Sequence, residues 1–253
     1  MKIGTILVAT DTNPLYCDFI PSFVRAWKAL LPEADICIVM IAHEIPERFA
    51  PYAQHIRLFP PIPEMHTAFQ SQCIRLLYPR HITRNEGVLI TDMDMLPMNR
   101  SYYVDSIQSY SNDAFVVYRN VCLPREISMC YNVAHPSVWS SMFGNESIET
   151  MLRTWYSGTG YSGQHGGVGW GTDQAILVRM FNQWKGTKIV LNDAVTKFRR
   201  LDRAFHTSVF DHRESLGMWI RRGYFADYHC LRPYANHKEV NDFIVSCLEG
   251  NSV

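Results

Sequence analysis

The chain's strongest constraint on its fold is a repeated order in which short apolar runs end in polar turns and are followed by segments with helical periodicity. The first run, Thr5 to Ala9, ends at Thr10 to Pro14, after which a helix fits residues 18–31. Further elements are predicted in the same order: strands at 36–42, 56–59, 87–90 and 114–118, and helices at 64–78 and 101–110. Such alternation predicts an α/β fold with a mostly parallel central sheet flanked by helices.

The second half of the chain is predicted to be less regular. A strand is expected at 129–134, and helices at 148–156 and 172–181. Between these helices, residues 157–171 hold seven of the chain's 14 glycines, which indicates a mobile loop. No composition shift divides the 253 residues, so we expect a single domain over 1–253.

The charge balance argues against a partner that is bound through the overall charge of the chain. Lys plus Arg equals Asp plus Glu at 24 each, so no bulk field favours nucleic acid or an acidic membrane. The N-terminal apolar run is too short for a signal peptide and no run would span a membrane, which predicts a soluble, cytoplasmic protein without a transmembrane anchor. Seven scattered cysteines without a CxxC pair predict reduced thiols. Nothing predicts the oligomeric state.

Two carboxylates directly follow the predicted strand at 87–90. Asp94 is a candidate for a direct metal ligand, whereas Asp92 can accept a ribose hydroxyl or reach the metal through water. Hard oxygen ligands of this kind suit Mn²⁺ or Mg²⁺. An isolated Asp-x-Asp triplet is also compatible with a solvated turn, so the inference depends on its place at the end of a strand.

The segment from Val88 to Pro97 resembles the strand and DxD motif of GT-A glycosyltransferases, which transfer sugars from nucleotide-sugar donors. Three other segments agree with the resemblance in order and context: Thr10 to Asn13 after the first strand, Gln72 and Arg75 on the helix before the motif, and Gly169 to Gln174. The resemblance implies one GT-A, Rossmann-like domain. Its nucleotide-sugar-binding part would cover about residues 1–125, and its irregular acceptor-side part about 126–253.

The resemblance also implies roles for individual residues. Donor or nucleotide binding is expected of Thr10, Asp11, Asn13, Arg75, Asp92 and Arg232, and metal binding of Asp92, Asp94 and His229. His229 is chosen because GT-A enzymes commonly recruit a ligand from the C-terminal region, although a lone histidine is more often structural. Trp170 and Tyr131 are expected to contact the acceptor. Residues 227–233 depart from the longer His, Gly, Lys, Pro ending of retaining relatives, so the stereochemistry stays open.

Asp173 is the candidate catalytic carboxylate, with two hypotheses for its role. It is either an acidic residue that the dipole at a helix N-terminus stabilises, or a group in the active site. As a general base it would deprotonate the acceptor hydroxyl and the reaction would invert the anomeric carbon. In a retaining enzyme it would instead orient the donor sugar. The glycine-rich residues 157–171 would then form a lid that excludes water.

These features favour a metal-dependent glycosyltransferase that uses a UDP- or GDP-linked donor, Mn²⁺ or Mg²⁺, and a hydroxyl acceptor such as a glycan. Two alternatives remain. A nucleotidyltransferase would need a basic, glycine-rich loop near the N-terminus, and residues 5–14 have none. A catalytically inactive module of the same fold would bind a nucleotide or carbohydrate without turnover.

Overall fold

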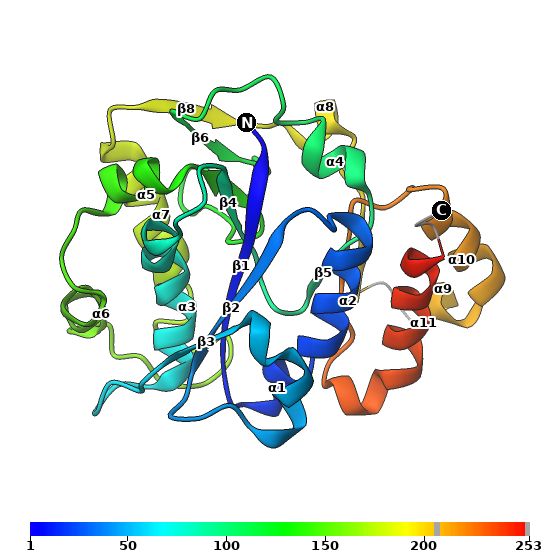
Figure 1. The fold of residues 1–253 in the computed structure, drawn as a ribbon, viewed down its shortest axis with the longest axis horizontal. Helices are drawn as coiled ribbons and strands as arrows, with labels where there is room; N and C mark the ends of the chain where they lie inside the picture. Colours follow the sequence, from blue (N-terminus) through cyan, green and yellow to red (C-terminus); the bar gives the residue numbers. More distant parts are fainter. Residues whose placement is uncertain (205–207, 251–253) are drawn as a thin grey trace.

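The computed structural model describes residues 1–204 and 208–250 and has a seven-stranded sheet at its centre (Figure 1). The strand order is β3-β2-β1-β4-β7-β6-β8. The strands are β1 (Ile3–Asp11), β2 (Asp35–Ile41), β3 (Ile56–Phe59), β4 (Gly87–Ile90), β6 (Ala114–Val117), β7 (Asn132–Ala134) and β8 (Thr187–Val190). Only β7 runs against its neighbours in this described sheet, so the predicted α/β fold with a mostly parallel sheet is confirmed.

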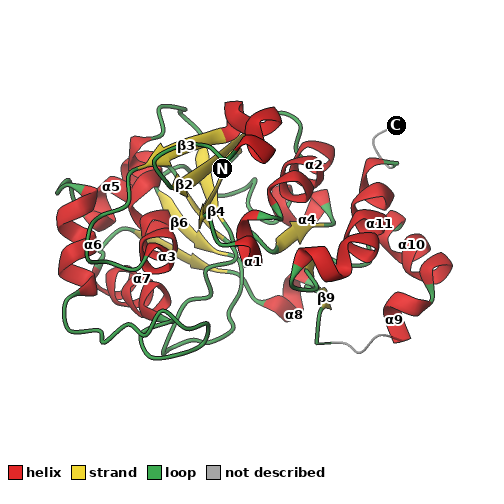
Figure 2. Ribbon diagram, turned by 90° about the horizontal axis from the view of Figure 1, so that it is seen from below, coloured by secondary structure: helices red, strands yellow, loops and turns green. Residues whose placement is uncertain are grey.

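Helices cover both faces of the sheet (Figures 1 and 2). One group consists of α3 (Thr67–Leu77), α5 (Pro136–Phe143), α6 (Ile148–Tyr156) and α7 (Thr172–Gln183). The other consists of α2 (Ile20–Leu30), α4 (Arg100–Val104) and α11 (Lys238–Glu249). The other helical elements of the described chain are α1 (Pro14–Cys17), η1 (Glu47–His55), η2 (Tyr78–His81), α8 (Asp193–Thr196), α9 (Ser208–Asp211), α10 (Arg213–Arg221) and η3 (Tyr234–His237). The helix predicted at 101–110 is therefore shorter than expected, because α4 ends at Val104.

The alternation of side chains along β1 explains why two hydrophobic cores form. Ile6 and Val8 belong to the core beneath α2 and α11, whereas Leu7 and Ala9 belong to the core beneath α3, α5, α6 and α7. Successive strand residues point to opposite faces, so a strand covered on both sides must be apolar throughout. All nine residues of β1 are buried. At roughly 1.5 to 3 kcal/mol for each large apolar side chain, this double burial is a main source of stability.

A second, three-stranded sheet joins the C-terminal part to the segment after Asp94. Its order is β5 (Met95–Pro97), β10 (Asp227–His229) and β9 (Arg200–Asp202). β10 runs antiparallel to β5 and parallel to β9. The buried Asp227 is tolerated within β10 because Arg200 lies 2.7 Å from its carboxylate and the Tyr131 hydroxyl donates to it at 3.0 Å. This sheet brings His229 beside Asp94.

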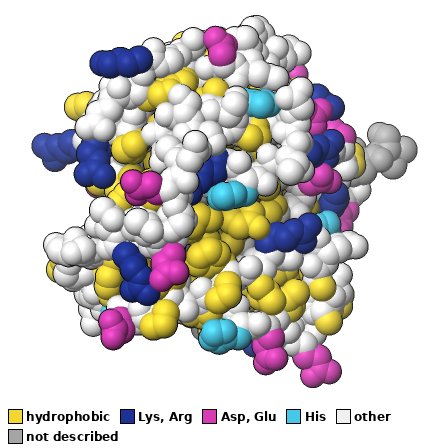
Figure 3. All heavy atoms as spheres, turned by 60° about the vertical axis from the view of Figure 1, so that its left-hand side comes forward, with side chains coloured by type: hydrophobic (Ala, Val, Ile, Leu, Met, Phe, Trp, Pro, Cys, Tyr) yellow, Lys and Arg dark blue, Asp and Glu magenta, His cyan; other side chains and the backbone are white. Residues whose placement is uncertain are grey.

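Several simpler features complete the description of the fold. All seven cysteines are free. Within residues 1–204 and 208–250, no helix combines the length and the apolar character that crossing a bilayer requires. Residues 157–171 form turns and bends without a helix or strand. On the face in Figure 3, acidic and basic side chains are both scattered among hydrophobic ones.

Candidate active site

A cavity of about 320 Å³ opens where β1 and β4 end. Its wall combines residues from four separate segments: Asp11 and Asn13 after β1, Asp92 and Asp94 after β4, Trp170 and Asp173 at the start of α7, and His229 and Arg232 at the end of β10. The volume lies within the range typical of ligand pockets. Ligands of open α/β sheets collect at the carboxyl ends of the strands.

A wider groove of about 1060 Å³ lies at the opposite ends of the strands. It is bounded by Thr5 and Asp35, which stand near the starts of β1 and β2. Its two acidic residues, Asp35 and Glu249, are already paired with Arg84 and Arg25. We assign the candidate active site to the smaller cavity, because it lies at the carboxyl ends of the strands and four acidic side chains, Asp11, Asp92, Asp94 and Asp173, line it.

The polar turn after β1 is held in shape by its own hydrogen bonds. The backbone N–H of Asn13 donates to Asp11 Oδ1 at 3.0 Å, and Thr67 Oγ1 donates to Asp11 Oδ2 at 2.9 Å. Asn13 Oδ1 in turn accepts from the backbone N–H of Leu15 at 3.0 Å and caps α1. Thr10 is buried and donates to the carbonyl of Asp11 at 3.0 Å. The predicted residues of this turn therefore line the cavity in a preorganised form.

Arg75 joins two of the cavity's carboxylates. One of its Nη atoms contacts Asp92 Oδ1, and the other donates to Asp173 Oδ2 at 2.8 Å. Its remaining donors reach the carbonyls of Thr91 at 3.1 Å and Gln72 at 3.2 Å. The side chain is only 7% exposed, so this guanidinium is a positioned, desolvated cation rather than a mobile surface group.

The two carboxylates that Arg75 joins have pKa values shifted in opposite directions. Burial tends to raise the pKa of Asp92, but Arg75, together with His229 and Arg200, holds that pKa below its usual value. For Asp173, whose side chain is 3% exposed, burial outweighs Arg75 and raises the pKa to about 6. One guanidinium thus pairs with two carboxylates, and Asp173 has the higher pKa of the two.

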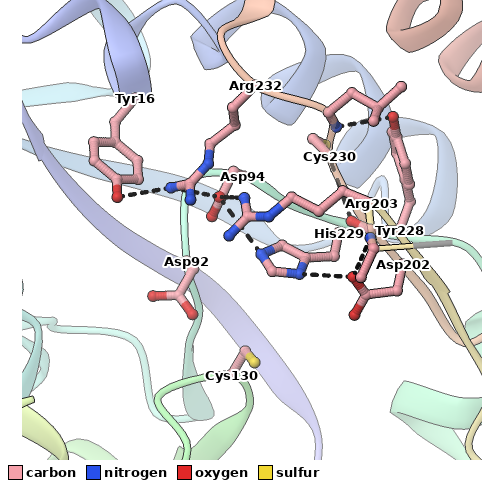
Figure 4. Close-up of polar contacts among 12 residues, drawn as sticks. Tyr16, Asp92, Asp94, Cys130, Asp202, Arg203, Tyr228, His229, Cys230 and Arg232 are labelled. Atoms are coloured by element: carbon pink, nitrogen blue, oxygen red, sulfur yellow. Dashed lines mark hydrogen bonds and ion pairs between the residues drawn. The ribbon is translucent and has the colours of Figure 1, made fainter. Parts of the chain in front are cut away.

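Asp94 lies in a cluster of nitrogen atoms (Figure 4). Arg203 Nη1 lies 2.8 Å, Arg232 Nη1 3.3 Å and His229 Nε2 3.7 Å from Asp94 Oδ2. Figure 4 shows that Asp92 lies apart from this cluster. Burial lowers the pKa of His229, which favours the neutral imidazole that metals bind.

The donor atoms of Asp94 and His229 fit a divalent cation. A carboxylate oxygen and an imidazole nitrogen suit Mn²⁺ or Mg²⁺, and both residues line the cavity together with Asp92. His229 Nδ1 is buried without a hydrogen-bond partner and lies 3.6 Å from Asp202 Oδ1, the kind of carboxylate that orients a ligating histidine. Within the described residues, however, no three acidic, histidine or cysteine side chains are gathered closely enough to hold a metal as they stand.

The glycine-rich residues 157–171 pack over the same cavity through aromatic and amide contacts. Tyr161 Oη donates to Gln72 Oε1 at 2.8 Å, and Gln72 Nε2 donates to the Trp170 carbonyl at 3.2 Å. The ring of Trp170 stacks on Tyr161 with centroids 6.2 Å apart. His165 Nε2 lies 3.1 Å from Arg232 Nη2, which links this loop to the C-terminal segment.

Gly169 is required by this packing. Its φ is +78°, and a Cβ there would lie 3.1 Å from Tyr161 Cα.

The structure brings together all but one of the predicted site residues. Tyr131, predicted to contact the acceptor, is 0% exposed, and its hydroxyl bonds to Asp227. It is a core residue without surface for an acceptor in this structure. Arg200, Arg203 and Tyr16 also line the cavity and were not predicted. The only sequence signal for the two arginines is a basic run, 199–203, whose partners lie elsewhere in the chain.

Comparison with solved structures identifies the fold. The chain is 14% identical to the glycosyltransferase GlyE of Streptococcus pneumoniae TIGR4, with a TM-score of 0.52, covering 97% of this chain and 63% of that one. It is 14% identical to the galactosyltransferase LgtC, solved in complex with donor and acceptor sugar analogs, with a TM-score of 0.52, covering 96% of this chain and 95% of that one. The chain thus spans less than two thirds of the GlyE structure.

These similarities show a GT-A glycosyltransferase fold and, at this identity, the fold alone. No protein-family model matches the sequence. No curated protein matches it either.

Proposed function

We propose that this chain is a metal-dependent glycosyltransferase that moves a sugar from a nucleoside diphosphate, with UDP- and GDP-linked donors the first choice, to a hydroxyl acceptor such as a glycan. One observation carries the proposal: Asp11, Asp92, Asp94, Asp173 and His229 converge on one cavity at the carboxyl ends of the strands. The GT-A fold supports it, because this is where the fold binds its donor.

Each segment of the wall has a proposed role. The turn at Asp11 and Asn13 would bind the nucleoside, and Arg232 would bind the diphosphate through charge-assisted hydrogen bonds. Asp94 and His229, with Asp92 facing the same space, would hold Mn²⁺ or Mg²⁺. The cation would supply charge stabilisation for the departing nucleoside diphosphate.

The acceptor side would be formed by Trp170 and Asp173. The Trp170 indole offers an apolar platform for a sugar ring, and Asp173 is held by Arg75 at the start of α7. With its pKa near 6, Asp173 is ionised at neutral pH and suited to accept a proton from the acceptor hydroxyl. That role gives inversion. If the product retains the donor's anomeric configuration, Asp173 would orient the donor sugar instead.

A donor-hydrolysis screen tests the proposal. Purified protein would be incubated with UDP-, GDP-, dTDP- and CMP-sugars, with and without Mn²⁺, and free nucleotide would be measured. We expect Mn²⁺-dependent release from one donor, abolished in D94N and unchanged in R84Q, which breaks the pair between Arg84 and Asp35 in the groove at the opposite ends of the strands. Normal release by D94N would contradict the proposal.

A non-catalytic nucleotide-binding module is the second candidate. It is favoured by the two arginines paired with Asp94, which neutralise the carboxylate without a metal. Calorimetric titration with UDP and GDP distinguishes the two. Binding that is indifferent to Mn²⁺, without turnover, would support the module.

A further inference from the structure

Three nitrogen-bearing side chains converge on a single atom, Asp94 Oδ2 (Figure 4). Arg203 is the nearest at 2.8 Å, and the Asp94 side chain itself is only 6% exposed. His229 Nε2 faces this same oxygen at 3.7 Å. A cation shared by Asp94 and His229 would therefore need the oxygen that Arg203 now holds.

We propose that Arg203 competes with the divalent cation for Asp94 and moves to the diphosphate of the nucleotide once that cation binds. The inference rests on the proposed function and adds a residue and a binding order to it. Arg203 would act as a positioning residue that makes the binding of metal and nucleotide cooperative.

Charge explains why the two ligands would depend on one another. Asp94 now offsets two guanidinium groups, those of Arg203 and Arg232, in a partly buried site. A divalent cation bound alone would leave both groups without their counter-charge and close to a further positive charge, which is unfavourable away from water. A nucleoside diphosphate supplies the missing negative charge, and guanidinium groups bind phosphate oxygens well.

Arg203, rather than Arg232, is the residue free to move. Arg232 also donates to Tyr16 Oη at 2.7 Å and lies 3.1 Å from His165 Nε2, so its position is fixed by two further contacts. Among the described residues, the Arg203 guanidinium has Asp94 as its hydrogen-bond partner. Its side chain is 24% exposed, so it can be changed without opening the core.

Binding of Mn²⁺, followed by the electron paramagnetic resonance signal of the free ion, tests the inference without any measurement of turnover. In the unmodified protein we expect UDP or GDP to tighten Mn²⁺ binding at least about fivefold, the lower end of typical couplings. In R203Q we expect Mn²⁺ alone to bind at least about fivefold more tightly than it binds to the unmodified protein. The nucleotide should then tighten Mn²⁺ binding by a smaller factor than in the unmodified protein. R203K keeps the competing charge and should resemble the unmodified protein.

A matched control is R84Q, which breaks an Arg–Asp pair of the same 2.8 Å length in the groove at the opposite ends of the strands and should change nothing. If R203Q binds Mn²⁺ as weakly as the unmodified protein or more weakly, the competition does not exist. Absence of any nucleotide effect on Mn²⁺ binding by the unmodified protein would also overturn the inference. If folded protein binds neither Mn²⁺ nor the nucleotides, the proposed function itself is wrong and this inference fails with it.

Discussion

Replacing Arg75 with methionine tests whether the cavity depends on one buried cation. Arg75 makes hydrogen bonds to two carbonyls and two carboxylates with its side chain 7% exposed. R75M keeps most of the side chain's bulk but leaves Asp92 and Asp173 without their cation. Removing one partner of a buried ion pair costs about 3 to 5 kcal/mol. That is a large fraction of the roughly 5 to 15 kcal/mol that stabilises a typical domain.

The stability lost in R75M should depend on pH, and the titration of Asp173 determines whether the loss grows or shrinks as pH rises. Its pKa is about 6 in the folded protein and about 3.9 in an unfolded chain, so the folded state binds the extra proton between these values. The free energy of unfolding therefore falls as pH rises through this window. Arg75 lowers this pKa, so R75M should raise it further and extend the loss toward neutral pH, at about 1.4 kcal/mol for each additional unit.

Urea unfolding at pH 5 and pH 8, followed by circular dichroism, measures both effects. R75M should lose about 3 to 5 kcal/mol at pH 8 and clearly less at pH 5, and R75M/D173N should recover part of the loss at pH 8. R100M is the matched control, because its pair with Glu33 at 2.6 Å is exposed and worth about 0.2 to 1 kcal/mol. Equal losses for R75M and R100M, without a pH trend, would refute the reasoning.

Three further predictions concern single residues in the candidate site and in the core beside it. If Asp173 is the general base, kcat/KM should rise about tenfold per pH unit up to its pKa of about 6 and then level off, and D173N should lose at least about 100-fold without that profile. G169A should raise the donor KM more than G166A, because both glycines have positive φ but only Gly169 would place a Cβ against Tyr161; steady-state kinetics of the pair shows this. Y131F should lower the free energy of unfolding by about 1 to 3 kcal/mol in urea titrations and leave the acceptor KM unchanged, since its hydroxyl serves the buried Asp227.

The elements that could be predicted from the sequence are those with a clear local pattern between turn residues. β3, β4 and α6 match the predicted bounds, because each is a compact apolar or periodic segment bounded by clear turns. The place of Asp92 at a strand end followed from the same pattern. Local sequence was sufficient for these elements because turn residues mark both of their ends.

The C-terminal strands could not be predicted, because their stability comes from distant partners. β10 is three residues long and contains Asp227, whose burial depends on Arg200 and Tyr131. No local pattern distinguishes such a segment from a loop. For the same reason the pairing of Arg203 with Asp94 was missed: side-chain length permits it, but only the tertiary fold brings the two together.

Formation of the small sheet of β5, β10 and β9 would be the step that completes the candidate site. His229 pairs with Met95 across this sheet, and the Cys230 amide donates to the Asp94 carbonyl at 2.9 Å. These contacts join segments far apart in sequence, and closing such long loops is slow. Under the proposed function, a nascent chain would therefore carry Asp92 and Asp94 before His229 could join them in binding a metal. We expect bound nucleotide and Mn²⁺ to slow the hydrogen exchange of the β10 amides more than that of amides in the other strands. The reason is that ligands bound at the end of β10 would disfavour its local opening.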